Sequence, residues 1–181
     1  MSTLIVEAVP RSRTEIRRAA ELMRRLAEDR LGVAGPPFPV IDVLERLIPL
    51  FDPEYSFEVE EEEDMGPHHG LAIPSQHVIK LRRDVYEGAC EGRGRDRSTA
   101  AHELGHYVLH DDIQFPRYLP QKSLPAYRDA EWQAKAFAGE FLIAPEYARG
   151  CADSTELIEK CGVSAEAARY QWKTLKEANL I

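Results

Sequence analysis

The chain has few cysteines, and their spacing excludes two classes of small protein. Cys90, Cys151 and Cys161 are the only three among 181 residues. An odd number without C-x-x-C spacing indicates neither a disulfide framework nor a zinc knuckle. We therefore expect three ordinary reduced thiols, as is usual in a cytoplasmic protein.

Long apolar runs and an excess of positive charge are also missing. No apolar run approaches the roughly 20 residues that cross a bilayer, and the run at 4–6 is too short for the core of a signal peptide. We expect a cytoplasmic protein with no membrane partner. The net charge of −8 disfavours direct nucleic-acid binding, because the phosphate backbone requires a positive surface. Acidic residues gather at Glu58 and 60–64, where we expect a solvated loop or a strand edge.

The remaining composition is that of an ordinary globular protein, with 44% hydrophobic and 30% charged residues. Hydrophobic periodicity predicts helices, then a small three-stranded sheet, then more helices, which is an α+β arrangement. We expect one domain over residues 1–150 and a helical appendage over 151–181. The first predicted helix is 14–31, with Thr14 as its cap, and the second is 40–48, closed by Pro49. A third helix carries residues 102–106. The remaining predicted helices begin at 129 or 130 and end at 143, or cover 154–160 and 164–178. The predicted strands are 55–59, 70–74 and 77–81, with loops at 88–94 and 111–127.

The most informative pattern is H-E-x-x-H at residues 102–106. On an α-helix, residues four apart lie on one face, so His102 and His106 can bind one Zn²⁺. Glu103 then lies beside a metal-bound water, as in a zinc-dependent peptidase. Ser98 or Thr99 is the expected N-cap. The alternative is an amphipathic helix whose histidines only pack or face solvent.

A catalytic zinc site usually has three protein ligands and one water. The glycine and third histidine of the metzincin pattern do not follow His106. His110 shares the helical face but lies about 6 Å further along the axis, so we expect it at the helix end or behind a ligand rather than on the ion.

The helix at 129–143 offers the missing ligand. Glu131, Ala134 and Ala138 share one face, and the two alanines would let this helix pack closely on the metal helix, bringing Glu131 to the ion. Glu140 lies nearly on the opposite side, so both acids cannot bind the same metal. We expect Glu140 to be solvated or to act as a cap.

These segments resemble a known family. Residues 97–110 resemble the signature R-x-T-x-A-H-E-x-G-H-x-x-L-H of the ImmA/IrrE metallopeptidases. Residues 131–145 resemble that family's E-x-x-A-x-x-F-A-x-x-L-L-M-P element, although the proline is displaced by one position. Residues 78–81 and 161–167 are similar to two further family segments. The likeness covers most of the chain and is strongest from 97 to 168.

The resemblance implies a zincin-like fold of the gluzincin type over residues 1–150, with Glu131 as the third zinc ligand. It also implies an intracellular zinc endopeptidase that cleaves a helix-turn-helix repressor of the XRE type and so switches on stress or mobile-element genes. Glu103 would act as general base. The candidate donors to the oxyanion are His110, Tyr107 and Tyr127. An extended substrate would pair with the strand at 77–81, and His68, His69 and His77 would have no part in catalysis.

A second class of function remains open. Residues 155–176 have the outline of a helix-turn-helix, and the last helix carries Arg169, Lys173 and Lys176. Glu166 and Glu177 dilute this charge, so a structural helical pair is preferred over a DNA-binding module. A zinc-bound regulatory protein without turnover is the other alternative, and an intact Glu103 weighs against it.

Overall fold

A computed structural model describes residues 7–110 and 125–181 of the chain. It is mostly helical with one small mixed sheet, which confirms the α+β prediction. The α-helices are α1 (Arg13–Leu31), α2 (Val40–Asp42), α3 (Ile48–Phe51), α4 (Glu62–Met65), α5 (Arg83–Cys90), α6 (Gly94–Leu109), α7 (Ala130–Leu142), α8 (Pro145–Ala148), α9 (Ser154–Cys161) and α10 (Ala165–Glu177). The strands are β1 (Ser56–Glu60), β2 (Gly70–Ile73) and β3 (Val78–Arg82). The π-helical turn is η1 (Val43–Leu47), and the two 3-10 turns are η2 (Pro74–Gln76) and η3 (Ala126–Arg128).

The first helix begins earlier than predicted. Ser12, not Thr14, is the N-cap of α1, and it forms a capping box with Glu15, in which each side chain bonds the other residue's backbone N–H. The helix ends at Gly32, whose φ of 66° is left-handed, as a glycine C-cap allows. The predicted end at Leu31 is therefore confirmed, while the predicted N-cap was two residues too far along the chain.

Pro49 does not close the second helical region, contrary to prediction. Helical backbone continues through α2, the π-helical turn η1 and α3 as far as Phe51. Pro49 lies just after the π-helical turn, so its missing backbone N–H falls where the hydrogen bonds change from i−5 to i−4 spacing.

The three predicted strands form one sheet in the order β1-β3-β2. β1 runs parallel to β3, with Phe57 opposite Ile79, and β2 runs antiparallel to β3, with Ala72 opposite Ile79. The predicted pairing of a substrate with residues 77–81 is wrong, because β3 is central and both of its edges are already paired. β2 is an edge strand, and it lies beside α6.

The predicted loop at 88–94 is also wrong for most of its length. Residues 83–90 form α5, and α6 begins at Gly94. Ser98 and Thr99 are therefore inside α6 and not N-caps; their hydroxyls donate to the carbonyls of Gly94 and Arg95. Gly94 serves packing rather than a turn, since a Cβ there would lie 2.3 Å from the carbonyl carbon of Val163.

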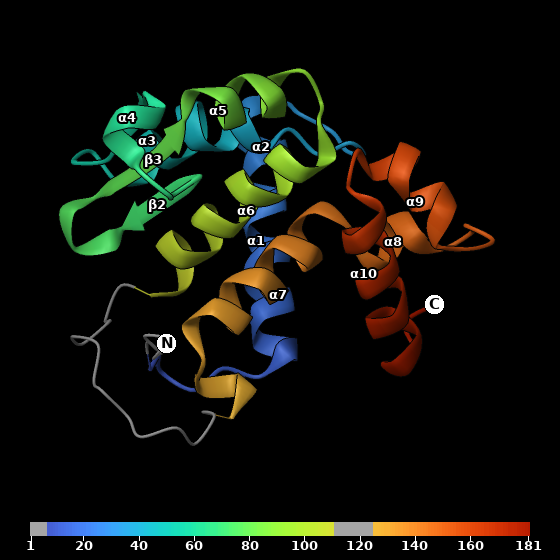
Figure 1. Cartoon of the computed structure of the whole chain (residues 1–181). Coiled ribbons are helices and arrows are strands. Elements are labelled where there is room, and N and C mark those ends of the chain that lie inside the picture. Colours follow the sequence, from blue (N-terminus) through green and yellow to red (C-terminus); the bar gives the residue numbers. More distant parts are fainter. Residues whose placement is uncertain (1–6, 111–124) are drawn as a thin grey trace.

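The helix with the H-E-x-x-H pattern occupies the middle of the molecule (Figure 1). The sheet and α5 lie against one side of α6, α7 lies along the other, and α1 packs against α7. Side chains of these elements form one apolar core around Phe38, Phe137 and Phe141. Among the described helices, none is long and apolar enough to cross a membrane. The predicted irregular segment 111–127 lies mostly outside the described residues.

Candidate metal centre

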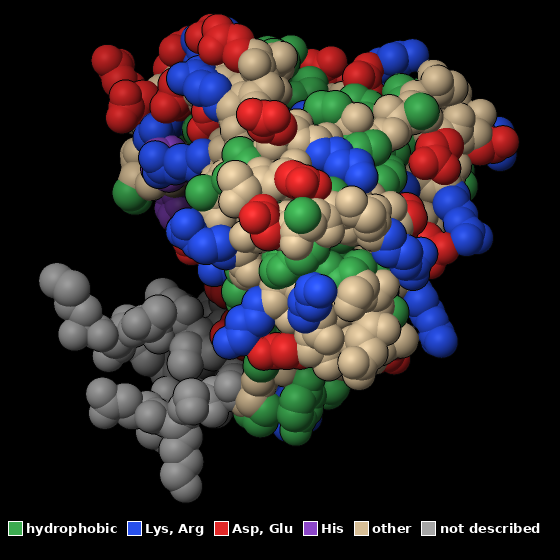
Figure 2. All heavy atoms as spheres, turned by 90° about the vertical axis from the view of Figure 1, so that its right-hand side faces the viewer, with side chains coloured by type: hydrophobic (Ala, Val, Ile, Leu, Met, Phe, Trp, Pro, Cys, Tyr) green, Lys and Arg blue, Asp and Glu red, His purple; other side chains and the backbone are tan. Residues whose placement is uncertain are grey.

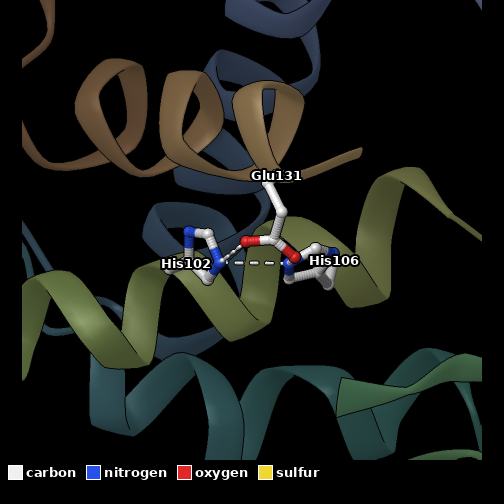
Figure 3. A group of neighbouring side chains, drawn as sticks. All are labelled: His102, His106 and Glu131. Atoms are coloured by element: carbon white, nitrogen blue, oxygen red, sulfur yellow. Dashed lines mark hydrogen bonds and ion pairs between the residues drawn. The ribbon is translucent and has the colours of Figure 1, made fainter. Parts of the chain in front are cut away.

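His102 and His106 present their outer ring nitrogens to each other on one face of α6. Their Nε2 atoms are 3.0 Å apart (Figure 3). This follows from the four-residue spacing, which stacks the two side chains one helical turn apart. His102 is 26% exposed and His106 14% exposed, so both rings are partly buried but still reachable from solvent.

Glu131 comes to the same point from the first turn of α7. Asp129 caps that helix by accepting from the backbone N–H groups of Glu131 and Trp132. One Glu131 carboxylate oxygen is 3.2 Å from His102 Nε2 and the other is 3.2 Å from His106 Nε2. The three side chains thus offer donor atoms that all lie within 4.8 Å of one another. In tetrahedral zinc sites with bonds of about 2.0–2.1 Å, ligand atoms lie about 3.4 Å apart, so the arrangement fits this ion.

A chain of hydrogen bonds sets the protonation of His106. Gln133 Nε2 donates to the carbonyls of Val9 and Tyr127, at 2.9 and 2.8 Å, which turns its Oε1 toward His110 Nε2 at 3.1 Å. That oxygen can only accept, so His110 carries its proton on Nε2 and leaves Nδ1 as an acceptor. His106 Nδ1, 3.0 Å away, must then be the donor.

The consequence of this chain is that His106 Nε2 carries a lone pair toward Glu131. Burial lowers the pKa of His110 to about 4, which keeps that ring neutral. A lone pair facing a carboxylate requires a positive charge between them, either a proton or a metal ion. Where that charge is a proton, hydrogen bonds from His102 and His106 hold the pKa of Glu131 well below its usual range. The expected placement of His110 behind a ligand agrees with this geometry.

Glu103 lies beside the three donors but points to the sheet. Its side chain is 8% exposed and fits under the start of β2, where a Cβ on Gly70 would lie 2.6 Å from Glu103 Cγ. Burial raises the pKa of Glu103, while the nearby His102 and His106 and a backbone hydrogen bond from Ala72 oppose the rise. A carboxylate with a raised pKa is a stronger base near neutral pH.

Two of the three predicted oxyanion donors are committed elsewhere. Tyr107 donates its hydroxyl hydrogen bond to Asp52. His110 is 3% exposed, and both of its ring nitrogens are taken up by His106 and Gln133. Tyr127 lies in η3 and is 50% exposed.

Histidines outside the motif lie away from the three donors. His77 contacts Asp52 at 2.7 Å and Glu54 at 3.4 Å at the start of β3, while His68 and His69 are on the surface before β2. None of the three belongs to the metal-binding group among the described residues.

The expectation of a solvated or capping Glu140 is wrong. Its side chain is fully buried and accepts from Arg13 and Arg17, each at 2.8 Å. Both arginines come from α1, so this carboxylate joins α1 to the face of α7 opposite the metal group. The separation of Glu131 and Glu140 on α7 is as the helical period predicted.

The C-terminal helices α9 and α10 contact each other, and the face shown in Figure 2 is not continuously basic. Figure 2 shows the face that carries α9 and α10, with acidic and basic side chains interspersed over it. Lys173 pairs with Glu177 at 3.7 Å, and Lys176 lies over the ring of Trp172. A phosphate backbone would require a continuous basic surface instead.

Sequence reasoning missed three residues that build the site. Gln133 sets the tautomer of His106, Gly70 makes room for Glu103, and Gly105 lets α7 approach α6. The glycine next to His106 was a usable signal, since glycine inside a helix is unfavourable unless packing requires it.

This arrangement is that of a metallopeptidase: two histidines lie on one helix, a glutamate reaches them from a second helix, and a buried acid lies beside them. Residues 61–173 match the family described as the IrrE N-terminal-like domain. The chain belongs to this family, the ImmA/IrrE metallopeptidases, and is therefore a metallo-endopeptidase. No curated protein matches its sequence significantly.

Proposed function

We propose that the chain is a zinc-dependent endopeptidase in which His102, His106 and Glu131 hold the ion and Glu103 is the general base. The convergence of three donor atoms within 4.8 Å, with a buried carboxylate beside them, is the observation that carries this proposal. Two imidazoles and one carboxylate are the donor set of catalytic zinc in many peptidases.

Glu103 is proposed to move the proton. Zinc bound here would lower the pKa of a coordinated water and polarise the scissile carbonyl. Glu103 accepts the proton of the attacking water and returns it to the leaving amine. Its burial supports this role, because a raised pKa lets a carboxylate both take and release a proton near neutrality.

The substrate backbone is proposed to add to β2. This strand is at the edge of the sheet and lies beside α6, and the Ala72 N–H reaches Glu103. An extended peptide paired with the outer edge of β2 would lie across the three donors, and sheet edges commonly hold peptides in this way.

The proposed target is a helix-turn-helix repressor of the XRE type inside the cell, whose cleavage would derepress stress or mobile-element genes. Family membership supports an endopeptidase acting on a protein, and the sequence resemblance to repressor-cleaving members supports this choice of protein.

The test combines metal analysis with cleavage of the repressor encoded beside this gene. The zinc-loaded chain should cut the repressor into two fragments, and Glu103→Gln should keep stoichiometric zinc while losing cleavage. His106→Ala should lose zinc. Cleavage by Glu103→Gln at the wild-type rate would refute the general-base role, and zinc retained by His106→Ala would place the ion elsewhere. A chain that cuts peptides but never the repressor would refute the target alone.

A further inference from the structure

A cavity of about 310 Å³ opens beside His102, between α6, α7 and α10. We propose that it is a substrate subsite that takes one large apolar side chain next to the scissile bond, with an acidic residue beside it. This inference rests on the proposed metal centre. It adds a substrate preference and gives the C-terminal helix α10 a part in selecting substrate.

The cavity begins at the proposed metal centre. On α6, Arg95 and Thr99 lie seven and three residues before His102, on the same helical face. On α7, Lys135 and Ala138 lie four and seven residues after Glu131, again on one face. The two walls therefore lead away from the candidate ligands, one from each helix. A side chain entering this space belongs to a substrate residue near the scissile bond.

The interior favours an apolar group. Ala138 and Leu142 of α7 and Val163 before α10 are buried residues that line it. The hydroxyls of Ser98 and Thr99 are also in the lining, but they donate to carbonyls inside α6. A volume of about 310 Å³ is at the small end of the range for ligand pockets, about 300–1,000 Å³. It is larger than one leucine, methionine or phenylalanine side chain, so it has room for such a side chain together with part of a neighbouring substrate residue.

Two cations accompany the apolar interior. Arg95 and Lys135 line the cavity and are exposed, and neither forms an ion pair with a carboxylate in residues 7–110 or 125–181. Lys135 Nζ lies 5.5 Å from the ring centroid of Tyr170. Glu166 is the single acid in the lining, so the cavity carries net positive charge on a chain of net charge −8. Charge complementarity favours an acidic substrate residue here.

The far wall comes from α10. Ala167 and Tyr170 of this helix close the cavity, and the backbone before it is fixed against Gly94 at the start of α6. The helical pair is thus connected to the cavity beside His102.

The test measures binding of metal-chelating probes to the zinc-loaded full chain, so it does not depend on turnover. Succinyl hydroxamates with a methyl or an isobutyl side chain are compared by calorimetry. We expect the isobutyl compound to bind about tenfold or more tightly, because its added carbons are removed from water. Ala167→Phe, which fills the cavity from α10, should remove this difference. Ala165→Phe is the matched control, since residue 165 is exposed on the same helix and outside the lining.

A second filling variant, Thr99→Met, tests the same point from α6 if Ala167→Phe does not fold. Equal binding of the two hydroxamates to wild-type protein would overturn the subsite and leave the metal centre standing. Binding of neither would refute the metal centre, and the subsite with it. A preference that survives both filling variants would also overturn the proposal.

The charge is tested separately. The isobutyl hydroxamate extended by an aspartate amide should bind more tightly than the same compound extended by a lysine amide. Lys135→Glu combined with Arg95→Glu should reverse that order, whereas Lys173→Glu on the outer face of α10 should not. An order unaffected by the double variant would refute the acidic preference.

Discussion

Gly105 of α6 lies directly against the backbone of Ala134 of α7. A Cβ on residue 105 would be 3.0 Å from the Ala134 carbonyl oxygen and 3.1 Å from its Cα. This close contact lies beside the candidate ligands, since His106 follows Gly105 on α6 and Glu131 precedes Ala134 by three residues on α7. This contact sets how far the Glu131 carboxylate reaches toward the histidines.

Gly105→Ala should therefore weaken metal binding although it improves local helix propensity. The added methyl has only backbone and Phe137 Cβ to displace, so α7 must shift by several tenths of an ångström. We expect a loss of about 1–3 kcal/mol in unfolding free energy and a lower zinc affinity by competition with a chromophoric chelator. An exposed helical glycine would instead gain about 1 kcal/mol on the same change, so a stabilised variant would contradict the contact.

Gln133→Leu should lower zinc affinity without removing a proposed ligand. It frees His110, and hence His106, to adopt the wrong tautomer. Loss of such an orienting partner typically costs about 10–100-fold in metal affinity. Nitrogen NMR of the zinc-free protein should show mixed His106 tautomers. Gln171→Leu is the control, because this glutamine is equally buried but bonds Arg13 and the Ile143 carbonyl instead. If both variants lost zinc affinity equally, the loss would come from general destabilisation and not from the His106 tautomer.

Glu131 and Glu140 of the same helix should respond oppositely to amide substitution. Glu140→Gln removes the charge that compensates Arg13 and Arg17, and we expect a loss of about 3 kcal/mol in unfolding free energy with zinc still bound stoichiometrically. Glu131→Gln should destabilise the metal-free protein less, because its side chain is 66% exposed and solvent screens its interactions with His102 and His106, but it should lower zinc affinity severely. Chemical denaturation measures the unfolding free energy of both variants, and metal analysis measures their zinc content. Loss of zinc from Glu140→Gln, or full zinc affinity in Glu131→Gln, would contradict the prediction.

Asp52→Asn should destabilise the protein in a pH-dependent way. Hydrogen bonds from Tyr107 and His77 hold the pKa of Asp52 below its usual range. A carboxyl with a lowered folded-state pKa contributes stability above its unfolded-state pKa of about 3.9, and that contribution is lost as the pH falls through the folded value. The difference in unfolding free energy between wild type and variant should be full at pH 7 and shrink below about pH 4. Glu54→Gln, on an exposed acid beside the same histidine, is the control; a pH-independent difference would contradict the assignment.

Local patterns predicted the elements of the fold well. The period of apolar residues located α1, the three strands, α7, α9 and α10 to within a few residues. The failures included α5, which the sequence patterns did not predict, and Pro49, Ser98 and Thr99, where helical backbone continued through residues that often end or begin helices. These residue types do favour helix ends, but the packing of the surrounding segment outweighed that local preference.

The positions of the metal-group side chains on their own helices were predictable for the same reason. The four-residue spacing alone puts His102 and His106 on one face, and the nine-residue spacing alone separates Glu131 from Glu140. These are properties of one helix, so the sequence by itself determined them.

Only the tertiary structure decided which surfaces meet. Three features depend on contacts between distant segments. Gly105 closely contacts Ala134, Glu140 is buried against two arginines more than 120 residues earlier in the chain, and β3 is the central strand of the sheet. Helical and strand periods specify which residues share a face, but they carry no information on the partner of that face. The partner is chosen by packing, by burial of charge with its counter-ion and by hydrogen bonding along a sheet.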